Sequence, residues 1–178
     1  LEVKTIDPAD VDFSASDYDM VVTSPGWRPD SQLLQQAAAA HIEVIGDVEL
    51  AWRLDRAEVF GPPRTWLVVT GTNGKTTTTG MLAAMMQANE AESGLRAAAA
   101  GNIGVSLFTA LAAQPRVDIL CVELSSFQLH WSNTLRPDVG TVLNLAEDHI
   151  DWHGGFEAYA LDKAKALLGK VAVVGKDD

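Results

Sequence analysis

Four apolar runs, separated by stretches of helical character, constrain the fold of this chain more than any other feature. The runs are TWLVV, DILCVEL, VGTVLNL and VAVVG. Near-continuous Val, Ile and Leu segments alternating with helices are typical of parallel strands covered on both faces. The sequence therefore predicts an α/β fold with a doubly wound, mostly parallel sheet, whose connections include helices near residues 75–87, 105–113 and 156–168.

The first third of the chain shows the same alternation on a smaller scale. Residues 18–24 have the pattern of a buried strand and residues 30–41 that of a helix, followed by a strand IEVIG and a helix DVELAWRLD. The FGPPR stretch then stops any helix or ladder, because adjacent prolines follow a glycine. We expect part of a smaller Rossmann-like domain over 1–60, a linker over 61–64 and a P-loop domain over 65–178.

Composition excludes several classes of partner. The 178 residues carry 13 Lys and Arg against 24 Asp and Glu, a net charge of -11, which would repel nucleic acid and anionic membranes. No apolar run approaches the roughly 18 residues that span a bilayer. The single cysteine, Cys121, lies in an apolar run and is expected to be a buried reduced thiol, which favours a cytoplasmic location. Because the chain starts at Leu1, we expect it to be part of a longer protein.

The stretch TGTNGKTTTT, residues 70–79, is a candidate phosphate-binding loop. The general pattern G-x-x-x-x-G-K-[ST] requires glycine at position 69, where this chain has valine. The loop nevertheless follows a strand and precedes a helix, with Gly71 and Gly74 for close backbone approach, Lys75 for phosphate charge and Thr76 for Mg²⁺. The alternative is an ordinary glycine-rich turn with a surface lysine.

Polar residues follow the next apolar strand. Glu123 ends DILCV, and ligands in open α/β sheets bind outside the carboxyl ends of strands, so this carboxylate is placed to complete a magnesium site. Alternatively, it points into water. Ser125 and Gln128, in LSSFQL, are suited to hydrogen-bonding a substrate but are equally ordinary in a loop.

The stretch NLAEDHIDWHGG concentrates histidines and carboxylates after the following strand. His149 and His153 have the i, i+4 spacing of a zinc pair, but a third zinc ligand is undetermined. Beside a phosphate loop, this composition favours Mg²⁺ and an anionic substrate.

The helix predicted over 156–168 has a lysine on its apolar stripe. At 100° per residue, Phe156, Ala160, Ala164 and Leu167 share one face, and Lys163 falls within it. Lys163 either extends along the stripe to water or occupies a protected site, where its amine can be neutral and chemically modified.

Five of these stretches together resemble the Mur ligase family in order and spacing. They are TGTNGKTTT, GNIG, VELSSFQL, LNLAEDHIDWH and YALDKAK, and the resemblance runs from about residue 18 to the end of the chain. The shorter loop of this family, G-x-x-G-K-[ST], accommodates Val69. TSPG, GDVEL and ELSSFQL resemble the branch that adds D-glutamate. The resemblance implies an ATP-dependent ligase that joins D-glutamate to UDP-N-acetylmuramoyl-L-alanine through an acyl phosphate, for peptidoglycan synthesis.

The resemblance also implies roles for individual residues. The loop residues expected to bind ATP are Gly71, Thr72, Asn73, Gly74, Lys75, Thr76 and Thr77. Thr76 and Glu123 would hold one Mg²⁺; His149 and a carbamate formed on Lys163 would hold a second, and Lys75, His149 and Lys163 would be the catalytic residues. Residues expected to contact the UDP-linked muramoyl substrate are Ser24, Pro25, Gly26, Asn102, Ser125 and Gln128.

Other interpretations stay open at this point. The chain lacks stretches resembling the start of the UDP-binding domain and the C-terminal domain, so by itself it is expected to be an inactive monomer. A related ligase that adds a different amino acid, or one similar to folylpolyglutamate synthase, would share most of these stretches. A nucleotide-binding module without catalysis is a further alternative. A P-loop GTPase is disfavoured because N-K-x-D and D-x-x-G signals do not follow the loop.

Overall fold

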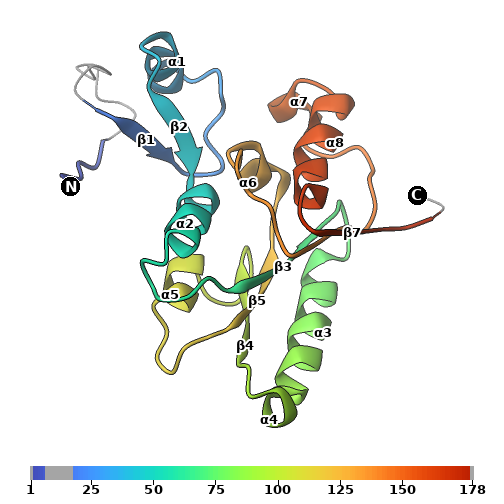
Figure 1. The fold of residues 1–178 in the computed structure, drawn as a ribbon. Coiled ribbons are helices and arrows are strands. Elements are labelled where there is room, and N and C mark those ends of the chain that lie inside the picture. The colour runs from blue at the N-terminus through green and yellow to red at the C-terminus, as the bar shows by residue number, and fades with distance from the viewer. Residues whose placement is uncertain (1, 7–17, 177–178) are drawn as a thin grey trace.

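The computed structural model describes residues 2–6 and 18–176, which contain two parallel sheets (Figure 1). A two-stranded sheet pairs β1 (Met20–Thr23) with β2 (Glu43–Gly46). A five-stranded sheet has the order β4-β5-β3-β6-β7, and every pairing in it is parallel. Its strands are β3 (Thr65–Thr70), β4 (Ala97–Gly101), β5 (Ile119–Glu123), β6 (Val139–Val142) and β7 (Val171–Val174). The predicted doubly wound α/β fold is confirmed.

Helices connect the strands and cover the larger sheet. They are α1 (Gln32–Ala39), α2 (Asp47–Arg56), α3 (Lys75–Ala88), α4 (Glu90–Ser93), α5 (Leu107–Leu111), α6 (Ser126–His130), α7 (Ile150–His153), α8 (Phe156–Ala164) and the 3₁₀ helix η2 (Lys165–Leu167). Figure 1 shows α3 on one side of the sheet and α2 and α5 on the other. In the described part of the chain, no helix combines the length and apolarity that crossing a membrane requires.

The main core lies between the sheet and the α2, α5 and α6 side. Successive side chains of a strand point to opposite faces, so Trp66 and Val68 of β3 belong to this core while Val69 faces α3. The Trp66 ring meets Trp52 of α2 edge to face, with 5.3 Å between ring centroids. Helix α2 is therefore packed on the larger sheet, although it follows β2 directly in the chain.

Two predicted helices are shorter than expected. Helix α5 starts only at Leu107, because Ser106 caps it by accepting a hydrogen bond from the N–H of Thr109 at 3.1 Å. The helix predicted over 156–168 is regular to Ala164 and then tightens into η2. Helix ends commonly tighten in this way.

The apolar stripe predicted for α8 is wrong, although the burial of Lys163 is confirmed. Phe156 is 42% exposed, whereas Tyr159, Asp162 and Lys163 are buried and Lys163 is 2% exposed. The buried face carries polar groups that find partners inside the molecule, so a search for apolar residues selected the neighbouring row.

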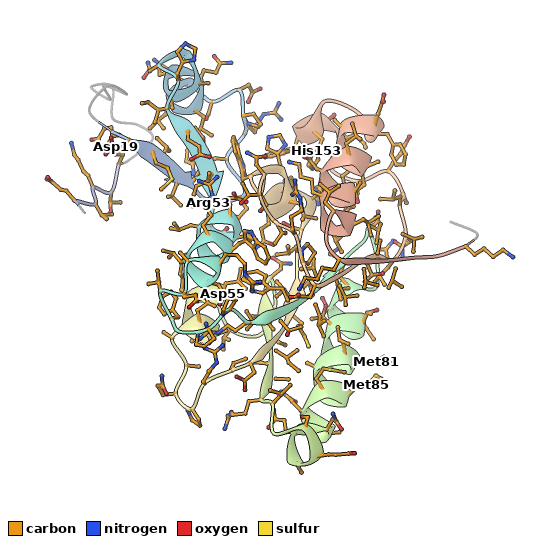
Figure 2. The ribbon with its side chains drawn as sticks, viewed as in Figure 1. Asp19, Arg53, Asp55, Met81, Met85 and His153 are labelled. Atoms are coloured by element: carbon orange, nitrogen blue, oxygen red, sulfur yellow. The ribbon has the colours of Figure 1, made fainter. Side chains whose placement is uncertain are left out.

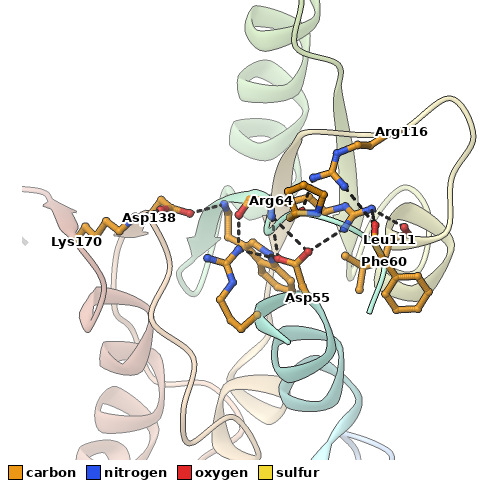
Figure 3. A network of polar contacts seen from close by, with 10 residues as sticks. Asp55, Phe60, Arg64, Leu111, Arg116, Asp138 and Lys170 are labelled. Atoms are coloured by element: carbon orange, nitrogen blue, oxygen red, sulfur yellow. Dashed lines mark hydrogen bonds and ion pairs between the residues drawn. The ribbon is translucent and has the colours of Figure 1, made fainter. Parts of the chain in front are cut away.

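The last residue of the predicted linker, Arg64, is fixed in the core. Arg64 is 3% exposed and forms an ion pair with Asp55 of α2 at 2.9 Å (Figure 3). Its guanidinium also donates to the carbonyl oxygen of Leu111 at 2.6 Å, at the end of α5. The link between the two sheets thus has a fixed conformation, and the position of the domain boundary stays a prediction.

Candidate functional site

Segments from four strands meet at one edge of the larger sheet. Strand β3 leads into the glycine-rich loop, β4 ends at Gly101, β5 ends at Glu123 and β6 leads to Asn144. All four strands are parallel, so their carboxyl ends share this edge, where open α/β sheets bind ligands.

The loop has the backbone of a phosphate cradle. Gly71 has φ 152° and Gly74 has φ 82°; a Cβ added at Gly71 would lie 3.0 Å from the Cβ of Leu143. Gly74 is the N-cap of α3, and Thr78 donates its N–H back to the Gly74 carbonyl at 3.0 Å. The N–H groups of the first helical turn have no acceptor inside the helix and are available to an anion.

Asn144 holds the outer part of the loop. Its carbonyl accepts from the N–H of Thr72 at 3.0 Å, and its Oδ1 accepts from the N–H of Asn73 at 2.9 Å. Its Nδ2 donates to the carbonyl of Asn73 at 3.1 Å. The Asn144 side chain thus joins the loop to the end of β6 through hydrogen bonds like those between neighbouring strands. Sequence reasoning missed this role.

Two lysines converge on one carbonyl oxygen. Lys75 Nζ donates to the carbonyls of Gly71 and Thr72 at 3.0 and 2.9 Å. Lys163 Nζ donates to the same Gly71 carbonyl at 2.8 Å, with Thr70 Oγ1 at 3.4 Å. Burial lowers the pKa of Lys163 to about 8, and the nearby charge of Lys75 acts in the same direction. The neutral form of the Lys163 amine is therefore a minority at pH 7, but far more populated than in an ordinary lysine.

Tyr159 is a second residue that sequence reasoning missed. Its hydroxyl lies 2.7 Å from Thr72 Oγ1, and Lys163 Nζ lies 4.9 Å from its ring centroid. One signal was available, because Tyr159 precedes Lys163 by four residues and so shares its helix face. Tyr159 connects α8 to the loop.

Glu123 has the environment of a cation ligand. It is 2% exposed, its Oε1 accepts from Asn102 Nδ2 at 3.0 Å, and its Oε2 has no hydrogen-bond partner among the described residues. Alternation along β5 places this side chain on the α3 face, and Thr76 is the second residue of that helix. A buried carboxylate oxygen without a partner is costly, and a divalent cation would relieve that cost. The group fits Mg²⁺, which prefers oxygen ligands.

The remaining predicted residues have different surroundings. Ser125 and Gln128 form a capping box at the start of α6, with the Ser125 N–H donating to Gln128 Oε1 at 2.9 Å. The His149 side chain is 49% exposed and pairs with Asp148 at 3.4 Å. No contact joins His149 to Lys163 among the described residues. The turn of Ser24, Pro25 and Gly26 lies beside α7, since Trp152 Nε1 donates to the Gly26 carbonyl at 3.2 Å. Roles for these residues stay predictions.

A loop of this form between a strand and a helix, at the carboxyl edge of a parallel sheet, defines a phosphate-binding α/β domain of the P-loop type. Comparison with known proteins identifies the family. Residues 69–178 match the Mur ligase middle domain. The chain belongs to the Mur ligase family.

Two curated relatives share one name. The chain is 66% identical to the UDP-N-acetylmuramoylalanine--D-glutamate ligase of Corynebacterium diphtheriae, over 98% of this chain and 36% of that protein. It is 58% identical to the enzyme of the same name from Mycolicibacterium vanbaalenii, over 99% of this chain and 35% of the relative. The chain thus spans about a third of the length of the curated relatives it matches.

Solved structures support the fold. A UDP-N-acetylmuramoyl-L-alanyl-D-glutamate--2,6-diaminopimelate ligase aligns with a TM-score of 0.57 at 24% identity, over 92% of this chain and 42% of that one. The MurF ligase of Thermotoga maritima, solved in complex with ADP, aligns with a TM-score of 0.54 at 20% identity, over 93% of this chain and 45% of that one.

Proposed function

We propose that this chain forms the ATP-binding part of a ligase that joins D-glutamate to UDP-N-acetylmuramoyl-L-alanine in peptidoglycan precursor synthesis. The observation that carries the proposal is the convergence of Lys75 and Lys163 on the Gly71 carbonyl, inside a phosphate-type loop. The relatives named for D-glutamate ligation, up to 66% identical, support the choice of substrate. We also propose a cytoplasmic monomer.

The loop would bind the phosphates of ATP. Its contacts would come from the N–H groups of residues 71–77 and from Lys75, which would exchange its two carbonyl acceptors for phosphate oxygens. In an acidic chain of net charge -11, these local groups would supply the attraction that the protein surface lacks. The carboxylate of the muramoyl substrate would attack the γ-phosphate of ATP, which forms an acyl phosphate and releases ADP. The amine of D-glutamate would then attack the acyl carbon, which forms the amide and releases phosphate.

Residues around the loop would hold Mg²⁺. Thr76 and Glu123 would hold one ion, and the unpartnered Oε2 of Glu123 supports this assignment. His149 and a carbamate on Lys163 would hold a second. Bound Mg²⁺ supplies positive charge that neutralises phosphate oxygens.

Lys163 has the properties that carbamate formation requires. Its amine is buried and its pKa is lowered to about 8, so the neutral nucleophile is accessible at physiological pH. Addition of CO₂ to the neutral amine releases one proton and leaves an anionic oxygen ligand in place of a cation. That anion would face Lys75, whose positive charge would stabilise it.

The substrate assignments come from the family resemblance, and the positions of Asn102 and of the turn at residues 24–26 support them. Asn102 bonds to Glu123 at the same sheet edge, and the turn of Ser24, Pro25 and Gly26 ends β1 beside α7. We propose that Asn102, Ser125 and Gln128 contact the muramoyl part and that the turn contacts the UDP diphosphate. Residues 1–60 would be part of the UDP-binding domain, and 65–178 of the ATP-binding domain.

A chimera tests the proposal. The segment of the Corynebacterium diphtheriae ligase that matches this chain is replaced by residues 1–178, and phosphate release is measured with Mg-ATP and UDP-N-acetylmuramoyl-L-alanine. We expect release that depends on D-glutamate and fails with L-glutamate, L-lysine or meso-diaminopimelate. The isolated 178-residue chain is expected to release no phosphate.

Two outcomes would contradict the proposal. A folded chimera that binds ATP but releases no phosphate with any amino acid would favour a binding module without catalysis. Release with a different amino acid would keep the reaction class and change the substrate. Binding of a fluorescent ATP analogue, compared with a Lys75→Ala chimera, shows whether the loop itself is functional.

A further inference from the structure

A second cluster of chemically active side chains lies outside the loop, where α6, α7 and α8 meet. His130 is the last residue of α6, His153 the last of α7, and Asp162 lies within α8. His130 Nδ1 and His153 Nδ1 lie 2.8 and 2.9 Å from the same oxygen, Asp162 Oδ2. The three potential ligand atoms all lie within 4.8 Å of one another. Figure 2 labels His153, which lies at the end of α7 in the upper part of the view.

The surrounding hydrogen bonds orient each ligand. His153 Nε2 lies 3.0 Å from Ser126 Oγ, so the far side of this ring is fixed by a hydroxyl. Lys165 Nζ lies 3.0 Å from Asp162 Oδ1 and leaves Oδ2 to face the two imidazoles. Such outer contacts fix the ring orientation and the tautomer of metal-binding histidines.

Burial and nearby charges favour the protonation states in which His153 and Asp162 bind a metal ion. The His153 side chain is fully buried, and burial lowers its pKa despite the opposing effect of Asp162, so the ring is neutral at neutral pH. Burial alone would raise the pKa of Asp162, but its bonds to His130 and Lys165 outweigh this and lower it. The cluster therefore presents a neutral imidazole at His153 and an ionised carboxylate at Asp162.

Aromatic rings enclose the cluster on several sides. The His153 ring stacks on Phe127 at 5.6 Å with an interplanar angle of 7°, and meets Trp152 at 4.6 Å. The His130 ring meets Trp131 edge to face at 4.8 Å. The His130 side chain is 30% exposed, so solvent reaches the cluster from this side. That route allows entry of an ion and supply of a water molecule as a fourth ligand.

We propose that His130, His153 and Asp162 form a binding site for a divalent transition metal ion of the Zn²⁺ type, separate from the magnesium sites at the loop. Zn²⁺ takes histidine nitrogen and carboxylate oxygen at about 2.0–2.2 Å in a tetrahedral arrangement, which separates ligand atoms by roughly 3.4 Å. Asp162 Oδ2 now lies 2.8 and 2.9 Å from the two imidazole nitrogens, so small side-chain rotations open the site.

Ligand chemistry separates this site from the loop. Mg²⁺ prefers six oxygen ligands, whereas two imidazoles and a single carboxylate select Zn²⁺ and its neighbours. The sequence pair His149 and His153 does not form this site, because the structure groups His153 with His130 and Asp162, while His149 lies beside Asp148. His130, 23 residues before His153, takes its place.

The metal would join three helices. Asp162 precedes Lys163 directly, and α7 begins one residue after His149. An ion bound here would therefore fix both segments that the proposed function uses, while its binding does not depend on that function being correct.

Titration of the 178-residue chain with ZnCl₂, in a large excess of MgCl₂, tests the site. We expect a single Zn²⁺ per chain with a micromolar or lower Kd, and a rise in Tm of about 5–10 °C at roughly 100 times Kd. In place of Zn²⁺, Co²⁺ should give the intense visible bands of tetrahedral coordination. Zn²⁺ should also move the imidazole protons of His130 and His153 from Nδ1 to Nε2 in ¹⁵N spectra.

Matched variants assign the ligands. His130→Ala and Asp162→Asn should each weaken Zn²⁺ binding by at least about tenfold and remove the Tm shift. The control is His41→Asn, since His41 lies outside the cluster and its φ of 59° is tolerated by asparagine. Unchanged Zn²⁺ affinity in both ligand variants, displacement of Zn²⁺ by Mg²⁺, or unchanged ¹⁵N tautomer signals in the wild-type chain would each overturn the proposal.

Discussion

Buried charged groups at the two ends of the larger sheet differ in whether their hydrogen bonds are complete. At the amino end, both oxygens of Asp55 accept hydrogen bonds, from Arg64, Trp66 Nε1 and Arg56 (Figure 3). Burial alone would raise the pKa of Asp55, but these bonds outweigh burial and lower it. At the carboxyl end, Glu123 Oε2 has no partner among the described residues, and burial lowers the pKa of Lys163.

We interpret Asp55 as a structural group and Glu123 as a group that binds a ligand. A buried carboxylate whose bonds are made within the chain holds α2 against the start of β3 and needs no ligand. A buried charge whose bonds are incomplete destabilises the protein until a ligand completes them. The predictions below test this contrast, from the largest expected effect to the smallest.

Asp55→Ala should lower the free energy of unfolding by about 3–5 kcal/mol, because it leaves the buried Arg64 without its counter-charge. Urea denaturation measures the loss. Asp30→Ala is the control, since the Arg28–Asp30 pair is exposed and should contribute little to stability. Equal losses in the two variants would mean that the buried Asp55–Arg64 pair stabilises the protein no more than an exposed pair does.

Lys75→Ala should reduce phosphate release by the chimera about 10²- to 10³-fold, because a positive charge aimed at the phosphates is lost. Its Tm should stay close to that of the parent, since Lys75 bonds only to loop carbonyls in the described residues. Lys170→Ala, which removes an exposed lysine paired with Asp138, should keep full activity. A large drop in Tm for Lys75→Ala would give this lysine a structural role instead.

The pH dependence of stability should reveal Lys163. Its pKa is about 8 in the folded chain against 10.5 when unfolded, so the unfolded state binds more protons between these values. Stability from this group should therefore rise as the pH increases from about 8 to 10.5, by up to roughly 3 kcal/mol. Lys163→Met should lack that rise. Urea denaturation without divalent metal gives the stability of the parent and of Lys163→Met at each pH. If the two stabilities change with pH in the same way, Lys163 is charged when buried.

Tyr159→Phe should cost about 0.5–1.5 kcal/mol, the usual range for one hydrogen bond, because it removes the contact with Thr72 Oγ1. Urea denaturation gives the value, and hydrogen exchange at the loop shows whether the loss is local. Leu161→Ala, 63% exposed on the same helix, should change stability by less than about 0.5 kcal/mol. An effect no larger than this control would mean that the hydroxyl does not hold the loop.

The sequence by itself determined the alternation of strands and helices and the loop at residues 70–79. These features follow from local rules: hydrophobic periodicity marks each element, and glycines followed by a lysine mark a strand-to-helix phosphate loop. The outcome for α8 shows the limit of such rules. Its buried row contains Tyr159, Asp162 and Lys163, which hydropathy assigns to the surface.

Only the tertiary structure decided the strand order, and with it which distant side chains meet. Asn144 reaches the loop because β6 lies beside β3, and His130 meets Asp162 across 32 positions because α6 lies beside α8. Each of these contacts depends on how whole elements pack, a property that no local pattern contains, whereas the loop is a single continuous segment that its own residues specify.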